Sequence, residues 1–264
     1  MTVFVEGVGL LGPGLTGWQA SVPVLSGRSE YGAAPTQIRA SELLPVAERR
    51  RSPVTVKLAL AAGEEAFRNA GRDAAAAATV FASSSGEGET LHQMGETLAS
   101  EDRDVSPTRF HNSVHNTASG YWGIATRSHE ASTSICCYDA SFSAGLIETV
   151  AQVAAFGKPV ALISYDQPYP EPLHSARPLV ASFATALVLA PQAARRTLAA
   201  LDLASIDGAG PATQMADPGL ETLRLGAPAA RALPLLRALA CAAPESVGMD
   251  FLASRQLRIA VSPC

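Results

Sequence analysis

The chain has 264 residues, of which 47% are hydrophobic and 17% are charged, and its formal net charge is −4 at pH 7. This composition supplies enough apolar side chains for a large core and lacks the excess of positive charge typical of nucleic-acid binding, so we expect no nucleic-acid partner. The four cysteines do not form a disulfide framework, and no basic residue precedes Arg28 to mark a signal peptide. We therefore expect a cytoplasmic protein without a membrane span.

In chain order, hydrophobic patterning predicts an alternation of strands and helices. The predicted strands cover residues 2–9, 79–84, 131–137, 159–165 and 183–190. The predicted helices cover residues 16–26, 52–70, 88–99 and 141–156. Such an alternation is typical of one layered α/β domain, and we expect a mixed sheet of about five strands.

The pattern weakens after Ala190. Residues 192–202 fit either a short helix or the edge of a last strand at 199–203, and residues 206–219 are rich in turn formers. Further along, the predicted elements are an amphipathic helix at 227–243 that Pro234 interrupts and a short final strand at 256–261. We therefore divide the chain into a domain at 1–205 and an extension at 206–264 that packs on its core.

The most informative segment is the turn between the strand at 131–137 and the helix at 141–156. The strand has no charged residue and reads as buried on both faces, and Asp139 or Ser141 is placed to cap the helix. Gly157 is expected to end the helix. A thiol at this turn would face backbone N–H groups and the positive end of the helix dipole, which stabilise a thiolate. The turn itself contains no cysteine.

The chain resembles the N-terminal half of the β-ketoacyl synthases, the condensing enzymes of the thiolase fold. Residues 1–31 are similar to the family's first strand, Gly-rich loop and helix, and residues 50–71 to its first long helix. Residues 79–88 (TVFASSSGEG) match a strand that enters a small-residue loop, and Asn116 and Gly120 fit the stretch before the active-site strand. The order and spacing of these segments carry the resemblance, which implies a single αβ half of a thiolase-like layered fold.

One departure from the family pattern concerns the nucleophile. In active members the strand ends in a Thr-Ala-Cys-like turn, and the cysteine, at the start of the helix, takes the acyl chain from an acyl carrier protein. Counting forward from Gly120 puts this position at Asp139, and counting back from Gly157 puts it at Ala140. The resemblance therefore implies a vestigial nucleophile position at Asp139 or Ala140 and no catalytic residue there.

A second departure concerns length and histidines. Working family members are roughly twice as long as one half, and their two catalytic histidines lie in HGT-like and NxFGFGGxN-like motifs of the second half, which this chain lacks. The five histidines present are His92, His111, His115, His129 and His174. The HNSVHN segment at 111–116 places two of them four residues apart, but no third ligand is evident, so we expect no metal site and no cofactor. The Ser83–Gly88 loop lacks the lysine of a phosphate-binding loop and reads as a tight turn between a strand and a helix.

These departures favour a non-catalytic subunit of the chain length factor type. The resemblance extends to the half-length ketosynthase-like proteins of aryl polyene and xanthomonadin-type pigment clusters. It implies a heterodimer with a full-length, active β-ketoacyl synthase that elongates a polyene, fatty-acid-like or polyketide chain on an acyl carrier protein, which this subunit contacts directly or through its partner.

The same resemblance assigns roles to several residues. Phe142 is a candidate to line the tunnel of the growing chain, and its alternative role is core packing. The arginines Arg49, Arg50 and Arg51 are candidates for docking the carrier protein, and their alternative is a solvated helix face. The residues predicted to form the dimer-edge strand are Ser132, Thr133, Ser134, Ile135, Cys136 and Cys137.

Two other classes of function stay open. Cys136 and Cys137 are expected inside the strand as buried free thiols, yet a displaced nucleophile would make the protein a small thiol or serine acyl hydrolase or transferase that uses Cys137 or Ser141 with one of the histidines. No G-x-S-x-G elbow surrounds Ser141. The third class is a free-standing homodimeric acyl-binding protein.

Overall fold

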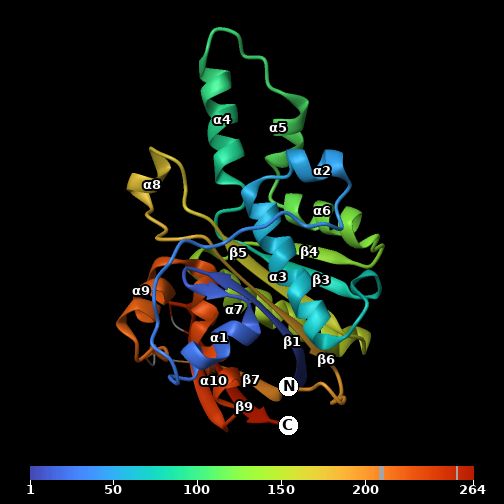
Figure 1. The fold of residues 1–264 in the computed structure, drawn as a ribbon, viewed down its shortest axis with the longest axis vertical. Helices are drawn as coiled ribbons and strands as arrows, with labels where there is room; N and C mark the ends of the chain where they lie inside the picture. Colours follow the sequence, from blue (N-terminus) through green and yellow to red (C-terminus); the bar gives the residue numbers. More distant parts are fainter. Residues whose placement is uncertain (208–210, 254) are drawn as a thin grey trace.

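A computed structural model describes residues 1–207, 211–253 and 255–264 of the chain. Their centre is a nine-stranded mixed sheet in the order β4-β3-β5-β6-β1-β7-β9-β8, with β2 paired to β1 (Figure 1). The strands are β1 (Thr2–Gly12), β2 (Leu15–Thr16), β3 (Ala78–Ala82), β4 (Ser132–Ile135), β5 (Val160–Asp166), β6 (Phe183–Ala190), β7 (Ala199–Asp207), β8 (Glu245–Leu252) and β9 (Arg255–Pro263). Strand β3 runs parallel to β4 and β5, and the other pairings are antiparallel.

The mixed sheet confirms the predicted α/β class, but the predicted strand number is wrong. All five predicted strands are present as β1, β3, β4, β5 and β6. The sheet is larger because β7, β9 and β8 continue it beyond β1. The stretch that fitted either a helix or a strand is the strand β7, whose bounds cross the predicted boundary at residue 205.

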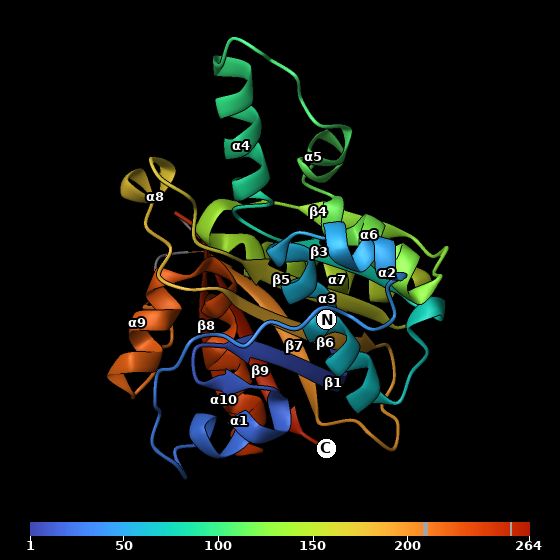
Figure 2. The ribbon, with the colours of Figure 1, turned by 45° about the horizontal axis from the view of Figure 1, so that its top comes forward.

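Helices cover both faces of the sheet (Figures 1 and 2). The α-helices are α1 (Trp18–Leu25), α2 (Val46–Arg51), α3 (Val54–Ala70), α4 (Gly88–Ala99), α5 (Pro107–Asn112), α6 (Thr117–Thr126), α7 (Ser141–Phe156), α8 (Leu173–Ala176), α9 (Pro218–Gly226) and α10 (Leu233–Cys241). The short 3-10 helices are η1 (Ala74–Ala76), η2 (Tyr138–Ala140) and η3 (Pro228–Ala232). The four predicted helices are found as α1, α3, α4 and α7, and α7 ends at Gly157, which takes the left-handed conformation.

Two hydrophobic clusters separate along the strands because successive side chains point to opposite faces. Leu162 of β5 belongs to the larger cluster, which also holds α7 and α10, whereas Ile163 belongs to the smaller cluster under α3 and α6. Gly9 of β1 lets α3 approach closely, since a Cβ at this position would lie 1.9 Å from the carbonyl oxygen of Ala62.

The described residues after β7 contribute to the larger cluster. The buried side chains of Ala229, Leu233 and Leu236 pack in the same cluster as α7 and β1. Pro234 does not interrupt a helix as predicted, because it lies in the first turn of α10, where proline is tolerated, and the preceding turn is the separate helix η3. In the predicted loop at 206–219, residues up to Asp207 belong to β7, and residues 208–210 lie outside the described residues.

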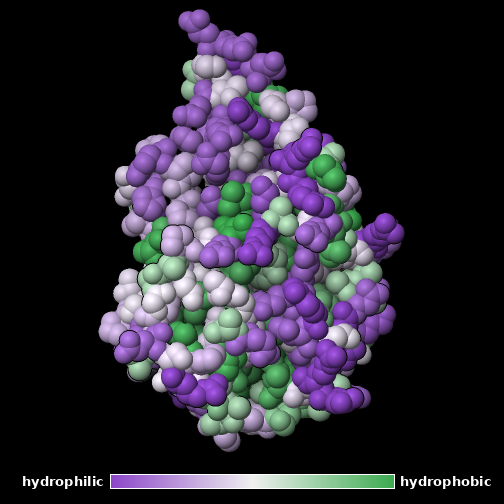
Figure 3. Space-filling view, in the orientation of Figure 1, coloured by the Kyte–Doolittle hydropathy of each residue, from purple (hydrophilic) through white to green (hydrophobic). Residues whose placement is uncertain are grey.

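Helices α4 and α5 rise away from the sheet as an arm, and hydrophilic side chains cover its tip (Figures 1 and 3). None of the helices among the described residues combines the length and the apolar character that a membrane span requires.

Candidate functional site

The candidate site is the turn between β4 and α7, where the resemblance predicts the position of the family's nucleophile. The chain leaves β4 at Ile135, forms the single 3-10 turn of η2 and enters α7 at Ser141. Tyr138 has a positive φ of 51°, which is uncommon for a residue with a side chain, and this conformation turns the chain sharply into the helix. Asp139 is half exposed at the mouth of the helix, and Ala140 is buried beneath it. Neither position carries a thiol.

Two predictions about this region are wrong. The strand predicted at 131–137 is not buried on both faces, and Cys136 and Cys137 do not lie inside it as buried thiols. Strand β4 ends before Cys136 and is the last strand of the sheet, so its residues are exposed or half-buried instead of covered on both faces. Cys136 is exposed, and its thiol donates a hydrogen bond to the carbonyl oxygen of Ser84 at 3.6 Å. Cys137 is half-buried.

The hydroxyl of Ser141 is occupied by the turn. The side chain is fully buried, accepts a hydrogen bond from the backbone N–H of Cys137 at 3.0 Å and donates one to the carbonyl oxygen of Tyr138 at 2.7 Å. The predicted cap is wrong in detail, since Ala140 is the N-cap residue and no side chain caps the helix. Among the described residues, no histidine is hydrogen-bonded to Ser141 or Cys137 to activate it as a general base would.

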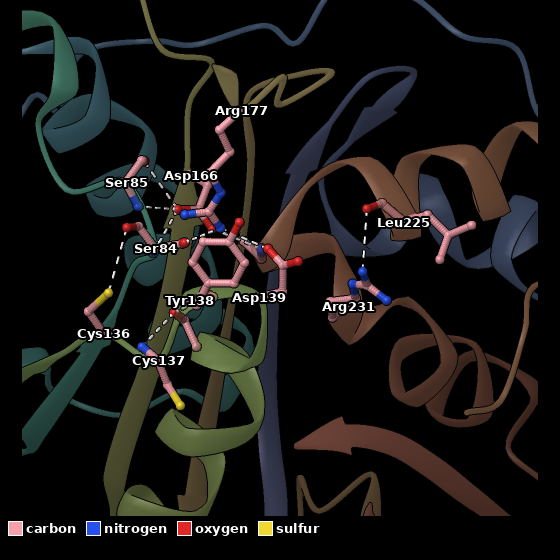
Figure 4. A network of polar contacts seen from close by, with 12 residues as sticks. Ser84, Ser85, Cys136, Cys137, Tyr138, Asp139, Asp166, Arg177, Leu225 and Arg231 are labelled. Atoms are coloured by element: carbon pink, nitrogen blue, oxygen red, sulfur yellow. Dashed lines mark hydrogen bonds and ion pairs between the residues drawn. The ribbon is translucent and has the colours of Figure 1, made fainter. Parts of the chain in front are cut away.

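Arg177, which lies between β5 and β6, contacts the turn through its side chain (Figure 4). Its Nη2 atom donates to Asp139 Oδ1 at 2.8 Å and to Ser84 Oγ at 2.7 Å. Its guanidinium carbon lies 3.5 Å from the centre of the Tyr138 ring, within the range of a cation–π contact. The guanidinium of Arg177 therefore lies against the turn, and Asp139 balances its charge.

A second carboxylate, Asp166, lies at the end of β5 next to this network (Figure 4). Its Oδ1 accepts hydrogen bonds from the backbone N–H groups of Ser84 and Ser85 at 2.8 and 3.0 Å and from the hydroxyls of Ser83 and Ser85. Its Oδ2 accepts one from the N–H of Ala229 in η3 at 2.9 Å. Full burial raises the pKa of Asp166 to about 6, although these hydrogen bonds oppose the shift.

This arrangement explains the serine-rich loop at residues 83–88. The loop does form a cradle of backbone N–H groups, but the anion that it holds is the chain's own Asp166. The loop then leads into α4, as predicted. The carboxylate thus joins β5, the loop after β3 and η3, which come from three distant parts of the sequence.

A pocket of about 710 Å³ opens beside the turn. Its walls are the turn from Cys137 to Ala140, Arg231 of η3 and the ends of β8 and β9. Arg231 Nη1 lies 3.0 Å from Asp250 Oδ2, so part of its charge is already neutralised. The apolar side chains among these lining residues include Phe251 and Leu252 at the end of β8.

The histidines of the HNSVHN segment do not converge. His115 Nε2 lies 3.1 Å from the carbonyl oxygen of Ser83, whereas His111 lies edge-on to the ring of Tyr121. Within residues 1–207, 211–253 and 255–264, no three His, Cys, Asp or Glu side chains lie together as metal ligands would.

The other predicted residues lie at separate places. Phe142 is fully buried in the larger hydrophobic cluster, which is the alternative role predicted for it. In α2, Arg49 donates to the carbonyl oxygens of Glu42 and Leu44, and Arg51 pairs with Glu48. Arg50 is exposed.

The predicted dimer-edge strand is only partly a strand. Residues 132–135 form β4, and Cys136 and Cys137 follow it as part of the turn. Because β4 is the terminal strand of the sheet, its outer side has no partner strand among the described residues. Its side chains are exposed or half-buried and uncharged, as an edge that pairs with another chain would be.

Sequence reasoning missed Arg177 and the role of Asp166. An acidic residue at the end of an almost wholly apolar strand was a usable signal for a buried carboxylate. Arg177 gave no such signal, because it lies 38 residues from Asp139 in an irregular segment between β5 and β6.

A family model described as the N-terminal domain of β-ketoacyl synthases matches residues 25–226. The chain therefore belongs to the β-ketoacyl synthase N-terminal domain family. It matches none of the curated proteins with which it was compared.

Solved structures share its fold. A chain of the ketosynthase ApeO in complex with its chain length factor ApeC, from Xenorhabdus doucetiae, superposes with a TM-score of 0.74 at 22% identity, covering 98% of this chain and 99% of that one. The ishigamide ketosynthase/chain length factor gives a TM-score of 0.73 at 14% identity, covering 100% of this chain and 99% of that one. A chain of AntDE:AntF, a type II polyketide synthase ketosynthase with its acyl carrier protein, gives 0.74 at 11% identity with the same two coverages. These similarities show a thiolase-like ketosynthase fold.

Proposed function

We propose that this chain is a non-catalytic ketosynthase-like subunit of the chain length factor type, which pairs with an active β-ketoacyl synthase during chain elongation on an acyl carrier protein. The observation that carries the proposal is the mouth of α7, where Asp139 and Ala140 stand in place of a nucleophile and Arg177 binds Asp139. A condensing enzyme needs a thiolate at this point to accept the acyl chain. A chain with this fold and without that thiolate fits the role of a companion subunit.

The similar structures support the choice of partner. The chain shares its fold over nearly its whole length with chains from complexes that contain ketosynthases and chain length factors. In this proposal, β4 is the edge that pairs with the ketosynthase, because it is uncharged and terminates the sheet. In the same proposal, the described residues after 205, which add β9 and β8 to the sheet, take the place of the second half of longer family members.

The remaining roles follow from the same proposal. Arg50 and Arg51 are the arginines of α2 that would meet an acidic carrier protein, with Arg49 supporting the helix from below. Phe142 would influence the tunnel by packing behind its wall, since its ring is fully buried. The pathway would make a polyene, fatty-acid-like or polyketide chain, and the protein would act in the cytoplasm without a cofactor.

The hydrolase alternative has less support. The Ser141 hydroxyl is buried and donates its proton to a backbone carbonyl, and Cys137 lacks a histidine partner among the described residues. A homodimeric acyl-binding protein remains an outcome of the following test.

Co-expression with the ketosynthase from the same gene neighbourhood, followed by size-exclusion chromatography with mass determination, tests the proposal. We expect a heterodimer with one copy of each chain. Ser132→Arg, which places a charge at the exposed position of β4, should abolish the heterodimer, whereas Ser262→Arg at an exposed position of β9, away from the terminal strand, should leave it intact. A stable homodimer that does not exchange with the ketosynthase would contradict the proposal.

A further inference from the structure

The arm, residues 88–112, lacks a core of its own. It consists of α4, α5 and the connection between them, and no residue from Leu91 to His111 is buried. An isolated helix of 12 residues, the length of α4, is only marginally stable in water. The helices of the arm therefore lack the buried apolar surface that stabilises α3 and α7.

The apolar side chains of the arm are exposed. In α4, Leu91 and Leu98 lie seven residues apart, which places them on one face of the helix, and they are 50% and 53% exposed. Phe110 of α5 is 64% exposed. The half-buried side chains of α4 are mostly polar: His92, Gln93, Met94 and Thr97. This distribution is the reverse of that in a helix that packs on its own core, and it is typical of a surface that another protein covers.

Exposed apolar residues continue from the arm toward the terminal strand of the sheet. Val114 follows α5 and Ile124 lies in α6, and both side chains are exposed. Helix α6 packs against β4. In Figures 1 and 2 the arm rises from the end of the molecule that holds α6 and β4, away from β9 and the C-terminus. A partner seated on the edge of β4 therefore lies next to the base of the arm.

The charge of the arm narrows the choice of partner. The arm carries two arginines and five acidic residues, so it holds most of the net charge of the chain. The acidic residues are Glu89, Glu96, Glu101, Asp102 and Asp104. A second copy of this chain is also net negative, and an acidic carrier protein has the same sign of charge, so electrostatic repulsion disfavours both as partners of the arm. A ketosynthase surface with basic residues beside an apolar patch has the complementary chemistry.

We propose that the arm is an interaction surface that docks on the partner ketosynthase. Its leucines and Phe110 pack against apolar side chains of the partner, and its acidic tip lies against basic ones. The inference rests on the proposed function and adds a second contact region to β4. Docking removes the exposed apolar side chains from water and gives the two helices the tertiary contacts that they lack. Because the contact needs both an apolar and a basic surface, the arm contributes to the choice of ketosynthase.

Binding of the purified ketosynthase to the full chain, measured by biolayer interferometry, tests the inference. Leu98→Asp places a carboxylate in the apolar contact and should raise the Kd at least about tenfold. The matched control is Leu225→Asp, because Leu225 is 54% exposed and also lies in the last turn of a helix, α9, away from the arm (Figure 1). The control should bind with the wild-type Kd. Replacing Glu101, Asp102 and Asp104 together by lysine should slow association and reduce its dependence on salt.

Hydrogen–deuterium exchange of the wild-type chain gives a second measurement that needs no substitution. In the heterodimer, the peptide covering residues 91–111 should exchange about tenfold more slowly than in the free chain, whereas the peptide covering α9 should exchange at the same rate in both. Equal exchange of residues 91–111 in the free chain and in the heterodimer would overturn the inference.

The outcomes separate this inference from the proposed function. If Leu98→Asp and Phe110→Asp both bind the ketosynthase with the wild-type Kd, the inference is overturned and the proposed function stands, because the heterodimer then forms without the arm. If the wild-type chain does not bind the ketosynthase, both are overturned. Sedimentation of the chain alone tests the remaining occupant, since a homodimer that Leu98→Asp dissociates would assign the arm to a second copy and overturn the inference.

Discussion

Two aspartates lie within the same network and behave as opposites. Asp139 is half exposed, pairs with Arg177 and lies at the start of α7, at a position that the sequence predicts to be the vestigial nucleophile position. Asp166 is completely buried, has no cation among its hydrogen-bond partners and is held by serine hydroxyls and backbone N–H groups. The comparison teaches that the carboxylate at the turn makes a half-exposed ion pair, whereas the buried carboxylate that joins distant segments lies on β5, two strands away from β4 in the sheet.

Among the substitutions that test this comparison, Asp166→Ala is expected to lower the free energy of unfolding most. The substitution leaves N–H and hydroxyl donors of the loop after β3 and an N–H of η3 without an acceptor, so we expect the free energy of unfolding to fall by about 3 kcal/mol. Chemical denaturation monitored by circular dichroism measures it. Asp202→Ala is the matched control, because Asp202 is exposed and pairs only at the surface with the N-terminal amino group, and its unfolding free energy should barely change. A loss in Asp166→Ala no larger than in the control would show that the cradle is not a structural anchor.

The second effect is a dependence of stability on pH. The folded-state pKa of Asp166, about 6, lies above the ordinary value of 3.8, so the folded protein binds more protons than the unfolded chain between these values. Stability from this group therefore rises as the pH falls, by about 1 kcal/mol between pH 7 and pH 5. Asp166→Asn cannot titrate, and its unfolding free energy should lack this rise.

The pKa values of other carboxyl groups also affect how stability depends on pH. Hydrogen bonds from Arg51, Ser175, the N-terminal amino group and Arg224 lower the pKa values of Glu48, Glu171, Asp202 and Glu221, respectively. The stability that these groups contribute is present above their unfolded pKa values and is lost only in more acidic solution. Burial also raises the pKa values of Glu64, Glu65 and Glu87, so the contribution of Asp166 is the difference between wild type and Asp166→Asn at pH 7, 6 and 5. Identical pH profiles of the two proteins would contradict the assignment.

The smallest expected effect is in Asp139→Asn. This variant keeps the shape of the side chain and removes the charge that pairs with Arg177, so the free energy of unfolding should fall by less than about 1 kcal/mol. Denaturation at low and high salt measures it, and the difference from wild type should shrink at high salt. A loss as large as that of Asp166→Ala would end the distinction between the two carboxylates.

Local patterns in the sequence were sufficient for much of the fold. The bounds of α4 and α7 were predicted to the residue, because a terminal glycine or serine and apolar spacing mark them. The position of β4 in the sheet was not predictable in this way, since an uncharged run looks the same at an edge as at the centre. Its exposure, and with it that of Cys136, depends on the strand order, which is set by the packing of distant segments.

The candidate site was predictable as a location and not as a set of contacts. Asp139 and Ala140 follow from counting residues from Gly120 and from Gly157 against the pattern of the family that the chain resembles. Arg177, which contacts Asp139, lies in the connection between β5 and β6. This connection holds only the single turn of α8, and its path has no periodic signature. The cradle around the Asp166 carboxylate needs β5, the loop after β3 and η3 to meet, and no local pattern of residues reports such a meeting.

The most direct test of the proposed function is the location of the acyl group in the complex. The heterodimer is incubated with a carrier-protein acyl thioester, and the intact mass of each subunit is then measured. We predict that the acyl group appears only on the partner ketosynthase and that this chain keeps its unmodified mass. An acyl adduct on this chain, at Cys137 or Ser141, would contradict the account.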